Sequence, residues 1–435
     1  MEYFFISFVL HFHNYKNFMQ HIGIYLQNQS NPKAIIHQIL KENLLQSWID
    51  TNNLQGAIFS SITINKLIED EMKHDKFVVR SANNNSLQYM SSGQKRKALL
   101  QYLLAQKPDF LIMDDIFASI DPQTQTVLLE ELHKTAAHTH LIQLFYRKND
   151  LLPYIQTVML LDEKNHIKLT KNREDFLQSN ASVIQQNFQL PINFLNSNAK
   201  PSNHPLVALK NLSISYNEKP VLNQINWQIN AGEFWQLTGP IGAGKSSLLT
   251  MITGDNPKAY GQDITLFGIK KGSGESIWDI KKRIGYFTPS MLVQFKRNMS
   301  VENMIISGLM DSVGLYVQAS DMQRRLAQNW MDILGNDFRR RNFQDLSLGQ
   351  QRMVMLARAM IKQPPLLILD EPTVGLDDAN AALFVAMVNA IAASKQIAII
   401  YVSHRQENDL QPDYIFQLKP DKNGSTGEIL NAFIE

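Results

Sequence analysis

The sequence contains no cysteine, no large excess of either charge and no long apolar run. Without cysteine, disulfides and thiolate metal sites are excluded, which fits a reducing compartment, so we expect a cytoplasmic location. The 42 Lys and Arg nearly balance the 40 Asp and Glu, and the formal net charge is +2. Because nucleic-acid binders usually concentrate positive charge, we expect no nucleic-acid partner.

The apolar residues 1–10 are far fewer than the roughly 20 needed to cross a bilayer. Glu2 stands where a signal peptide carries positive charge, and His11 and His13 follow the apolar residues. We therefore predict a buried strand here, with a signal peptide as the alternative. No other segment approaches the length of a membrane span, so we expect no integral membrane segment.

Residues 239–246, which we call the phosphate loop, fit the pattern G-x-x-x-x-G-K-[ST]. Glycines let backbone N–H groups turn toward phosphate oxygens, and a following helix presents its positive dipole end. A strand-like run before the loop and a helix-like run after it favour this interpretation over a chance glycine-rich turn. Lys245 would reach the β- and γ-phosphates, and the Ser246 hydroxyl would bind Mg²⁺. The predicted nucleotide-binding residues are Gly239, Pro240, Ile241, Gly242, Ala243, Gly244, Lys245, Ser246 and Ser247.

The length of 435 residues predicts more than one domain. Buried strands alternate with helices, which is typical of α/β domains with a parallel sheet. Residues 191–205 are rich in Asn, Ser and Pro and lack apolar periodicity. We therefore predict a first domain at residues 1–190, a linker at 191–205 and a second domain at 206–435.

Short segments of the first domain recur in the same order in the second. The matching pairs are residues 91–96 with 347–352, 111–115 with 367–371, and 119–121 with 375–377. This order indicates an internal duplication.

The phosphate loop, the Ser347-Leu348-Gly349-Gln350 signature, a strand ending in Asp370-Glu371, and His404 together resemble the ATP-binding cassette (ABC) ATPases. Residues 264–286 resemble more closely the soluble tandem-cassette subfamily named for molybdate transport (ModF-like). The resemblance implies two P-loop NTPase parallel-sheet cores, each with an antiparallel β subdomain and a helical signature subdomain, the first being incomplete. The molybdate label comes from the family name, because no residue here argues for an oxyanion substrate.

The chemistry of the residues and the resemblance together assign the catalytic roles. Asp370 suits a Mg²⁺ ligand, directly or through water, and Glu371 suits the general base that polarises the attacking water. His404 resembles the histidine that contacts the γ-phosphate, and Lys245 completes the catalytic set. Tyr216 resembles the aromatic residue that stacks on adenine, although simple packing is the alternative for a Tyr near a strand. We thus expect ATP and Mg²⁺ as cofactors.

The sequence departs from the family at a glutamine that usually contacts Mg²⁺ and the attacking water. Residues 288–290 (Thr-Pro-Ser) occupy its place, and Gln294 comes too late. The ModF-like proteins share this change, which puts the hydrolysis rate in doubt.

The first domain has no G-x-x-x-x-G-K-[ST] sequence. Gly239 precedes Ser347 by 108 residues, and the same spacing counted back from Ser91 falls before residue 1. We therefore expect this domain to have lost its phosphate loop, or an upstream segment to be missing, with Phe4 to Leu10 as the strand that follows the loop region. Asp115 stands where Glu371 stands, and Tyr146 aligns with His404.

The resemblance implies that one cassette's phosphate loop and another's signature enclose each ATP. The first-domain signature would then complete the only competent site; its predicted nucleotide-binding residues are Ser91, Ser92, Gly93 and Gln94. Such pairing can occur within one chain or in a homodimer, and both alternatives stay open.

The main hypothesis from the sequence is an ATPase that energises or regulates a transport system through a separate membrane permease. We expect it to be cytoplasmic, or peripheral on the inner face of the membrane. One alternative is a soluble switch acting on a ribosome or another nucleoprotein, although its usual long charged linker is absent. Another is a nucleotide-binding regulator that does not hydrolyse ATP.

Overall fold

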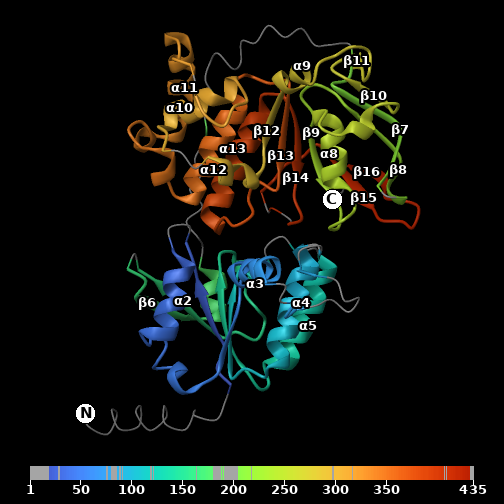
Figure 1. Ribbon diagram of the computed structural model, residues 1–435. Helices are drawn as coiled ribbons and strands as arrows, with labels where there is room; N and C mark the ends of the chain where they lie inside the picture. Colours follow the sequence, from blue (N-terminus) through green and yellow to red (C-terminus); the bar gives the residue numbers. More distant parts are fainter. Residues whose placement is uncertain are drawn as a thin grey trace. The chain divides into compact units, whose positions relative to one another are not determined.

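The computed structural model describes residues 19–431 except for residues 28–29, 75–76, 80–85, 88–89, 91, 118–119, 121, 163, 180–187, 189, 191–203, 217, 296–297, 316, 406 and 408. The chain divides into two compact units, Met1–Asn180 and Ala181–Glu435, which are described one at a time (Figure 1). Most of the predicted linker lies outside the described residues, so the predicted domain boundaries stay a prediction.

The first unit is a six-stranded sheet with helices on both faces (Figure 1). Its strands are β1 (Ile22–Tyr25), β2 (Gly56–Phe59), β3 (Phe110–Asp114), β4 (His140–Phe145), β5 (Thr157–Leu161) and β6 (Ile167–Asn172). Its helices are α2 (Pro32–Lys41), α3 (Ser61–His74), α4 (Ser92–Ala105), α5 (Pro122–Thr135) and α6 (Arg173–Gln178). The strand order is β2-β3-β4-β1-β5-β6, and only β6 runs antiparallel to its neighbour.

Alternate residues of β3 supply the cores on the two faces of this sheet. Phe110 and Ile112 belong to the cluster that includes Ile35 and Ile39 of α2. Leu111 and Met113 belong to the cluster with apolar residues of α4 and α5. A strand buried on both faces is typical of a parallel sheet covered by helices, as predicted.

The second unit combines a six-stranded sheet with a four-stranded antiparallel sheet. Its strands are β7 (Val207–Tyr216), β8 (Lys219–Ile229), β9 (Phe234–Thr238), β10 (Asp263–Leu266), β11 (Ile269–Lys270), β12 (Ile284–Phe287), β13 (Leu366–Asp370), β14 (Ala398–Val402), β15 (Tyr414–Lys419) and β16 (Thr426–Asn431). Its helices are α8 (Lys245–Thr253), α9 (Ile277–Lys282), α10 (Val301–Ile306), α11 (Asp321–Leu334), α12 (Leu348–Met360) and α13 (Asp378–Ala393). The large sheet has the order β12-β13-β14-β9-β15-β16, and the small one β11-β10-β7-β8.

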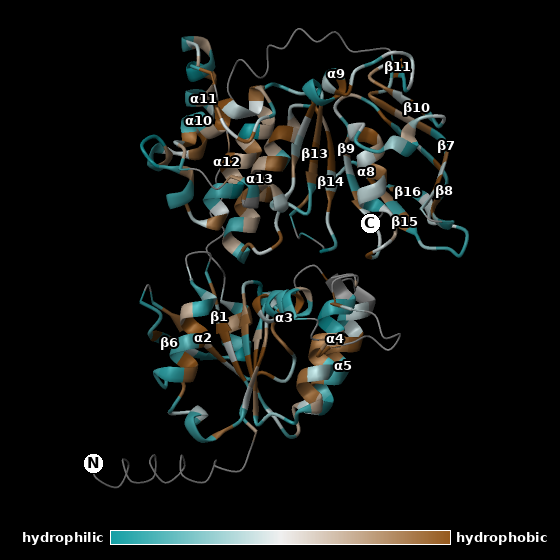
Figure 2. Ribbon diagram, viewed as in Figure 1, coloured by the Kyte–Doolittle hydropathy of each residue, from teal (hydrophilic) through white to brown (hydrophobic). Residues whose placement is uncertain are grey.

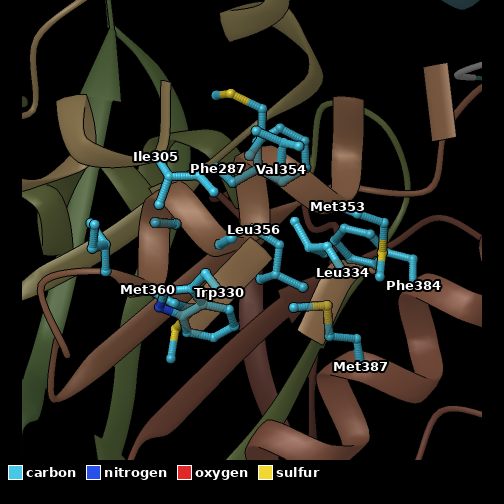
Figure 3. Close-up of a cluster of buried hydrophobic side chains, with 14 of the residues drawn as sticks. Phe287, Ile305, Trp330, Leu334, Met353, Val354, Leu356, Met360, Phe384 and Met387 are labelled. Carbon is cyan, nitrogen blue, oxygen red and sulfur yellow. The ribbon is translucent and has the colours of Figure 1, made fainter. Parts of the chain in front are cut away.

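Helices α10, α11 and α12 lie to one side of the large sheet, and the antiparallel sheet lies to the other, with α8 between the two sheets (Figure 1). Trp330 of α11, Leu356 of α12 and Phe384 of α13 belong to one buried cluster with strand residue Phe287 (Figure 3). Figure 2 shows the apolar colouring concentrated on the central strands of this sheet. Within the described residues, no helix is both long and apolar enough to cross a membrane.

The two six-stranded sheets share one strand order, in which β1 takes the place of β9. Asp114 pairs with Leu144 as Asp370 pairs with Val402. Counted from these pairs, Ile24 corresponds to Leu237 and Tyr25 to Thr238, the residue that directly precedes the phosphate loop. The internal duplication predicted from the sequence is therefore also present in the strand order of the two sheets.

This correspondence corrects the predicted position of the first loop. Residues 26–33 follow β1 and lead into α2, just as residues 239–246 follow β9 and lead into α8. The spacing argument failed because the first unit is shorter: Leu26 precedes Ser91 by 65 residues, whereas Gly239 precedes Ser347 by 108. The strand predicted at Phe4 to Leu10 lies outside the described residues.

Two element boundaries lie at residues with a left-handed backbone. Helix α2 ends at Lys41, and the nearby Asn43 has φ 56°. Strands β10 and β11 are separated by a turn that contains Gly268, which has φ 79°.

Candidate functional site

The phosphate loop lies between β9 and α8, and its glycines are required by close packing and by backbone conformation. A Cβ on Gly239 would lie 2.8 Å from the Leu418 carbonyl oxygen, and one on Gly244 would lie 2.7 Å from Leu222 Cδ2. Gly244, with φ 94°, directly precedes the first residue of α8. Because glycine offers no capping side chain, the first N–H groups of α8 suit an anion.

Lys245 is buried at the first position of α8. Its Nζ donates to the carbonyl oxygens of Gly239 at 2.6 Å and Pro240 at 3.0 Å. The same Nζ lies 3.3 Å from His404 Nδ1. The ammonium group is therefore held at the mouth of the loop, while the neighbouring Ser246 is exposed.

Glu371 lies directly after β13 in a left-handed conformation with φ 51°, fixed by an N–H bond to the Val402 carbonyl at 2.9 Å. Its Oε1 lies 2.5 Å from His404 Nε2. Lys245, His404 and Glu371 thus form one connected polar chain, which joins three of the residues selected from the sequence. A non-glycine residue in this conformation costs energy and is often found at functional sites.

Asp370, the last residue of β13, lies beside this polar chain. Burial and the neighbouring Glu371 charge raise the pKa of Asp370 to about 6, while Lys245, His404 and a hydrogen bond from Tyr286 act in the opposite direction. A nearby cation would reduce the repulsion between the Asp370 and Glu371 carboxylates, so this end of β13 fits a Mg²⁺ site.

Tyr216 lies at the end of β7 and is 37% exposed. Its Oη accepts a 2.6 Å hydrogen bond from Asn256 Nδ2. Lys258 Nζ lies 5.4 Å from the centroid of the Tyr216 ring. The ring is partly exposed and its hydroxyl is anchored, and its predicted stacking on adenine stays a prediction.

The signature predicted in the first unit is described only in part. Ser91 lies outside the described residues, and Ser92 and Gly93 begin α4. Gln94 is exposed. Their part in nucleotide binding stays a prediction.

In the second unit the signature forms a helix cap. Ser347 Oγ accepts from the Gln350 N–H at 3.3 Å, and Gln350 Oε1 accepts from the Ser347 N–H at 3.1 Å. A Cβ on Gly349 would lie 2.0 Å from Asn380 Oδ1. This signature is therefore also part of the packing between α12 and α13.

The loop of the first unit has different side chains in equivalent places. Asn31 corresponds to Gly244, and its Oδ1 accepts from the N–H groups of Lys33 at 3.1 Å and Ala34 at 3.3 Å. Pro32 takes the place of Lys245. The helix start that could hold a phosphate is thus capped by the chain itself.

The acidic strand end is retained in the first unit. Asp115 has φ 46°, and its N–H donates to the Leu144 carbonyl at 3.1 Å, as Glu371 does to Val402. Burial and the Asp115 charge raise the pKa of Asp114 to about 6, while Arg96 lowers it. The first unit therefore keeps the acids, while its loop has Asn31 and Pro32 in place of Gly244 and Lys245.

Sequence reasoning missed Tyr286 and Asn256. Tyr286 hydrogen-bonds Asp370, and burial followed by the Asp370 charge raises its pKa well above the ordinary range. Its place on β12, the strand beside β13, could have indicated this contact. The Asn256 contact with Tyr216 joins two loops, and no local sequence pattern reveals it.

Comparison with known proteins points to one family. Residues 222–374 match the sequence profile described as ABC transporter. The chain is 38% identical over 366 residues to the ABC transporter ATP-binding protein ModF of Escherichia coli (strain K12), covering 80% of this chain and 74% of that protein. It is 28% identical to the uncharacterized ABC transporter ATP-binding protein C323.04 of Schizosaccharomyces pombe, covering 74% and 66% of the two chains.

Solved structures share the fold at low identity. A model of ribosome-bound archaeal Pelota and ABCE1 aligns with a TM-score of 0.63 at 12% identity, covering 95% of this chain and 75% of that one. The archaeal ribosome recycling factor aABCE1 in complex with the stalk protein aP1 aligns at 0.59 and 11%, covering 95% and 86%. These likenesses show the α/β cassette fold alone.

Proposed function

Since this chain belongs to the family of ABC transporter ATP-binding proteins, we propose that its second unit hydrolyses ATP at the phosphate loop. The family makes the chain an ABC-type ATPase, and the assignment of individual residues is our proposal. The observation that carries it is the connected set of Lys245, His404 and Glu371 at the loop between β9 and α8.

Each of these residues has a role that its position supports. Lys245 and the loop N–H groups hold the triphosphate, and His404 contacts the γ-phosphate. Glu371, bonded to His404, polarises the attacking water as general base. The exposed face of Tyr216 stacks on adenine.

We propose Ser246 and Asp370 as the protein ligands of Mg²⁺. Mg²⁺ usually takes few protein ligands and fills its other positions with water and substrate phosphates. When bound, the ion would neutralise charge that develops on the transferred phosphoryl group. Ser246 follows Lys245 in the phosphate loop, and Asp370 precedes Glu371 at the end of β13. The two proposed ligands therefore come from the same loop and strand end as the proposed catalytic residues.

The test compares equivalent loops of the two units. Lys245→Ala should lower the steady-state ATPase rate about 100-fold or more, since a charge that stabilises the transition state is lost. Lys33→Ala, a change to an exposed lysine in the corresponding first-unit loop, should leave the rate within about twofold. Normal hydrolysis by Lys245→Ala would refute the proposed site.

We further propose that Ser91, Ser92, Gly93 and Gln94 supply the signature that contacts ATP. What supports this is the motif and its place at the start of α4, where N–H groups suit a phosphate. The signature donor is either the same chain or a second copy.

We propose a membrane permease as the partner, with the chain acting from the cytoplasmic side of the membrane. The support is the family itself, whose members matched here are described as ABC transporter ATP-binding proteins. A Glu371→Gln variant held in ATP should co-purify with a membrane protein. Recovery with ribosomal particles instead would favour the switch function, which otherwise has the support of fold likeness alone.

A further inference from the structure

Asn256 is buried, with 6% of its surface exposed, between α8 and the 3-10 helix η4 (Pro257–Ala259). Its Nδ2 donates to Tyr216 Oη at 2.6 Å and to Thr250 Oγ1 at 3.1 Å. Its Oδ1 accepts from the Lys258 N–H at 3.1 Å. Both amide hydrogens and the carbonyl oxygen are thus engaged, which fixes the orientation of the side chain.

Asn256 is also tied to the helix that carries the phosphate loop. Its backbone N–H donates to the Thr250 carbonyl at 3.1 Å. Thr250 Oγ1 in turn donates to the Ser247 carbonyl at 2.8 Å. A continuous hydrogen-bonded path therefore runs from Ser247, in the first turn of α8, through Thr250 and Asn256 to the Tyr216 hydroxyl.

The Tyr216 ring lies on the antiparallel sheet, whereas the phosphate loop belongs to the large sheet. In ATP the base and the triphosphate are joined by one ribose, which limits how far apart their binding groups can lie. If the ring is already held at the correct distance from the loop, binding of the base does not have to restrict the motion of the Tyr216 side chain. The path through Asn256 spans these two parts of the nucleotide site.

We propose that Asn256 is a positioning residue that sets the Tyr216 ring against the phosphate loop and so adds to ATP affinity through the adenine base. This inference rests on the proposed function, in which Tyr216 stacks on adenine. Asn256 contacts the hydroxyl of the ring and need not touch the nucleotide.

A double-mutant cycle in the full-length chain tests this role. Tyr216→Phe removes only the hydroxyl, and Asn256→Ala removes its donor, so each should raise the KM for ATP about threefold to tenfold, the worth of one hydrogen bond. The double variant should match the single variants, because both remove the same contact. In all three, kcat should stay within about twofold.

Inorganic tripolyphosphate, used as a competitive inhibitor, separates positioning from a structural role. It has no base, so its inhibition constant should not change in Asn256→Ala. Thr253→Val is the matched control, since Thr253 is buried in the same segment and bonds Asp255 rather than Tyr216. This control should leave the KM for ATP unchanged.

Two results would overturn the inference: multiplied effects in the double variant, or equal weakening of ATP and tripolyphosphate in Asn256→Ala. The Tyr216→Ala variant tests whether Tyr216 stacks on adenine at all. If it leaves the KM for ATP unchanged, then Tyr216 is not the adenine platform, and that part of the proposed function fails as well. If it raises the KM while Tyr216→Phe and Asn256→Ala do not, only the positioning role is lost.

Discussion

The two units share one sheet order and one acidic strand end, yet among the described residues only the second unit has a glycine directly before the helix that follows the loop. In the second unit α8 begins after Gly244, whereas in the first α2 begins after Asn31, whose side chain bonds the first N–H groups of the helix. The comparison teaches that the fold does not require the loop sequence. A helix can begin at the same place with a side-chain cap, and the sheet keeps its strand order.

The largest expected contrast concerns the acids that follow β3 and β13. Glu371→Gln should lower kcat about 100-fold or more, because it removes the general base and keeps the shape. Asp115→Asn, the equivalent change in the first unit, should leave kcat within about twofold. Steady-state ATPase assays of both variants measure the contrast, and equal losses would mean that the first unit also hydrolyses ATP.

A smaller contrast is expected between the two signatures. Gly93→Asp should lower the ATPase rate about tenfold, since a carboxylate would repel the γ-phosphate. Ser347→Ala should instead lower the free energy of unfolding by about 1 kcal/mol through the lost helix cap, with the rate nearly unchanged. If Ser347→Ala lowers the ATPase rate and Gly93→Asp does not, then the second-unit signature serves the active site. That result is expected when the site forms between two copies of the chain.

The smallest contrast concerns stability and pH. The pKa of Asp114 is raised from 3.8 to about 6, so the folded state binds this proton more tightly than the unfolded chain does. Its contribution to stability is therefore present below pH 3.8 and lost as the pH rises through about 6. Asp114→Asn should remove this loss and raise the free energy of unfolding at pH 7.5 by on the order of 1–3 kcal/mol, with a smaller gain at pH 5.

Urea unfolding at the two pH values measures this gain, and Asp370→Asn provides the comparison. Asp370 has the same raised pKa of about 6, so its replacement should also stabilise the protein, but the proposed Mg²⁺ ligand is lost and ATPase activity with it. If Asp114→Asn also abolishes activity, the first-unit acids are functional and the comparison fails.

Much of the α/β fold was predictable from local sequence. The buried strands followed from apolar patterns, the family from its motifs, and the antiparallel strands from the resemblance to that family. The Lys245, His404 and Glu371 cluster followed from motif order, because strand ends of a parallel sheet meet at one edge.

What could not be predicted depended on segment lengths and on contacts between loops. The first loop was misplaced because a spacing transfers between repeats only when the intervening segments are equally long. Residues 26–33 contain no glycine pattern that marks a phosphate loop. The position of the first-unit loop follows from the pairing of β1 with β4 and β5. Asn256 was missed because its partners Thr250 and Tyr216 lie on different elements.

Gly244, which directly precedes α8, has a consequence for the protein in a living cell. The N–H groups at the start of α8 would bind the nucleotide's phosphates, so the second unit should gain stability with ATP supply, by about 2.7 kcal/mol when ATP is at 100 times its Kd. The start of α2 is capped by Asn31, so we expect no such dependence at the first-unit loop. A fall in ATP concentration would then lower the stability of the second unit and leave that of the first unit unchanged.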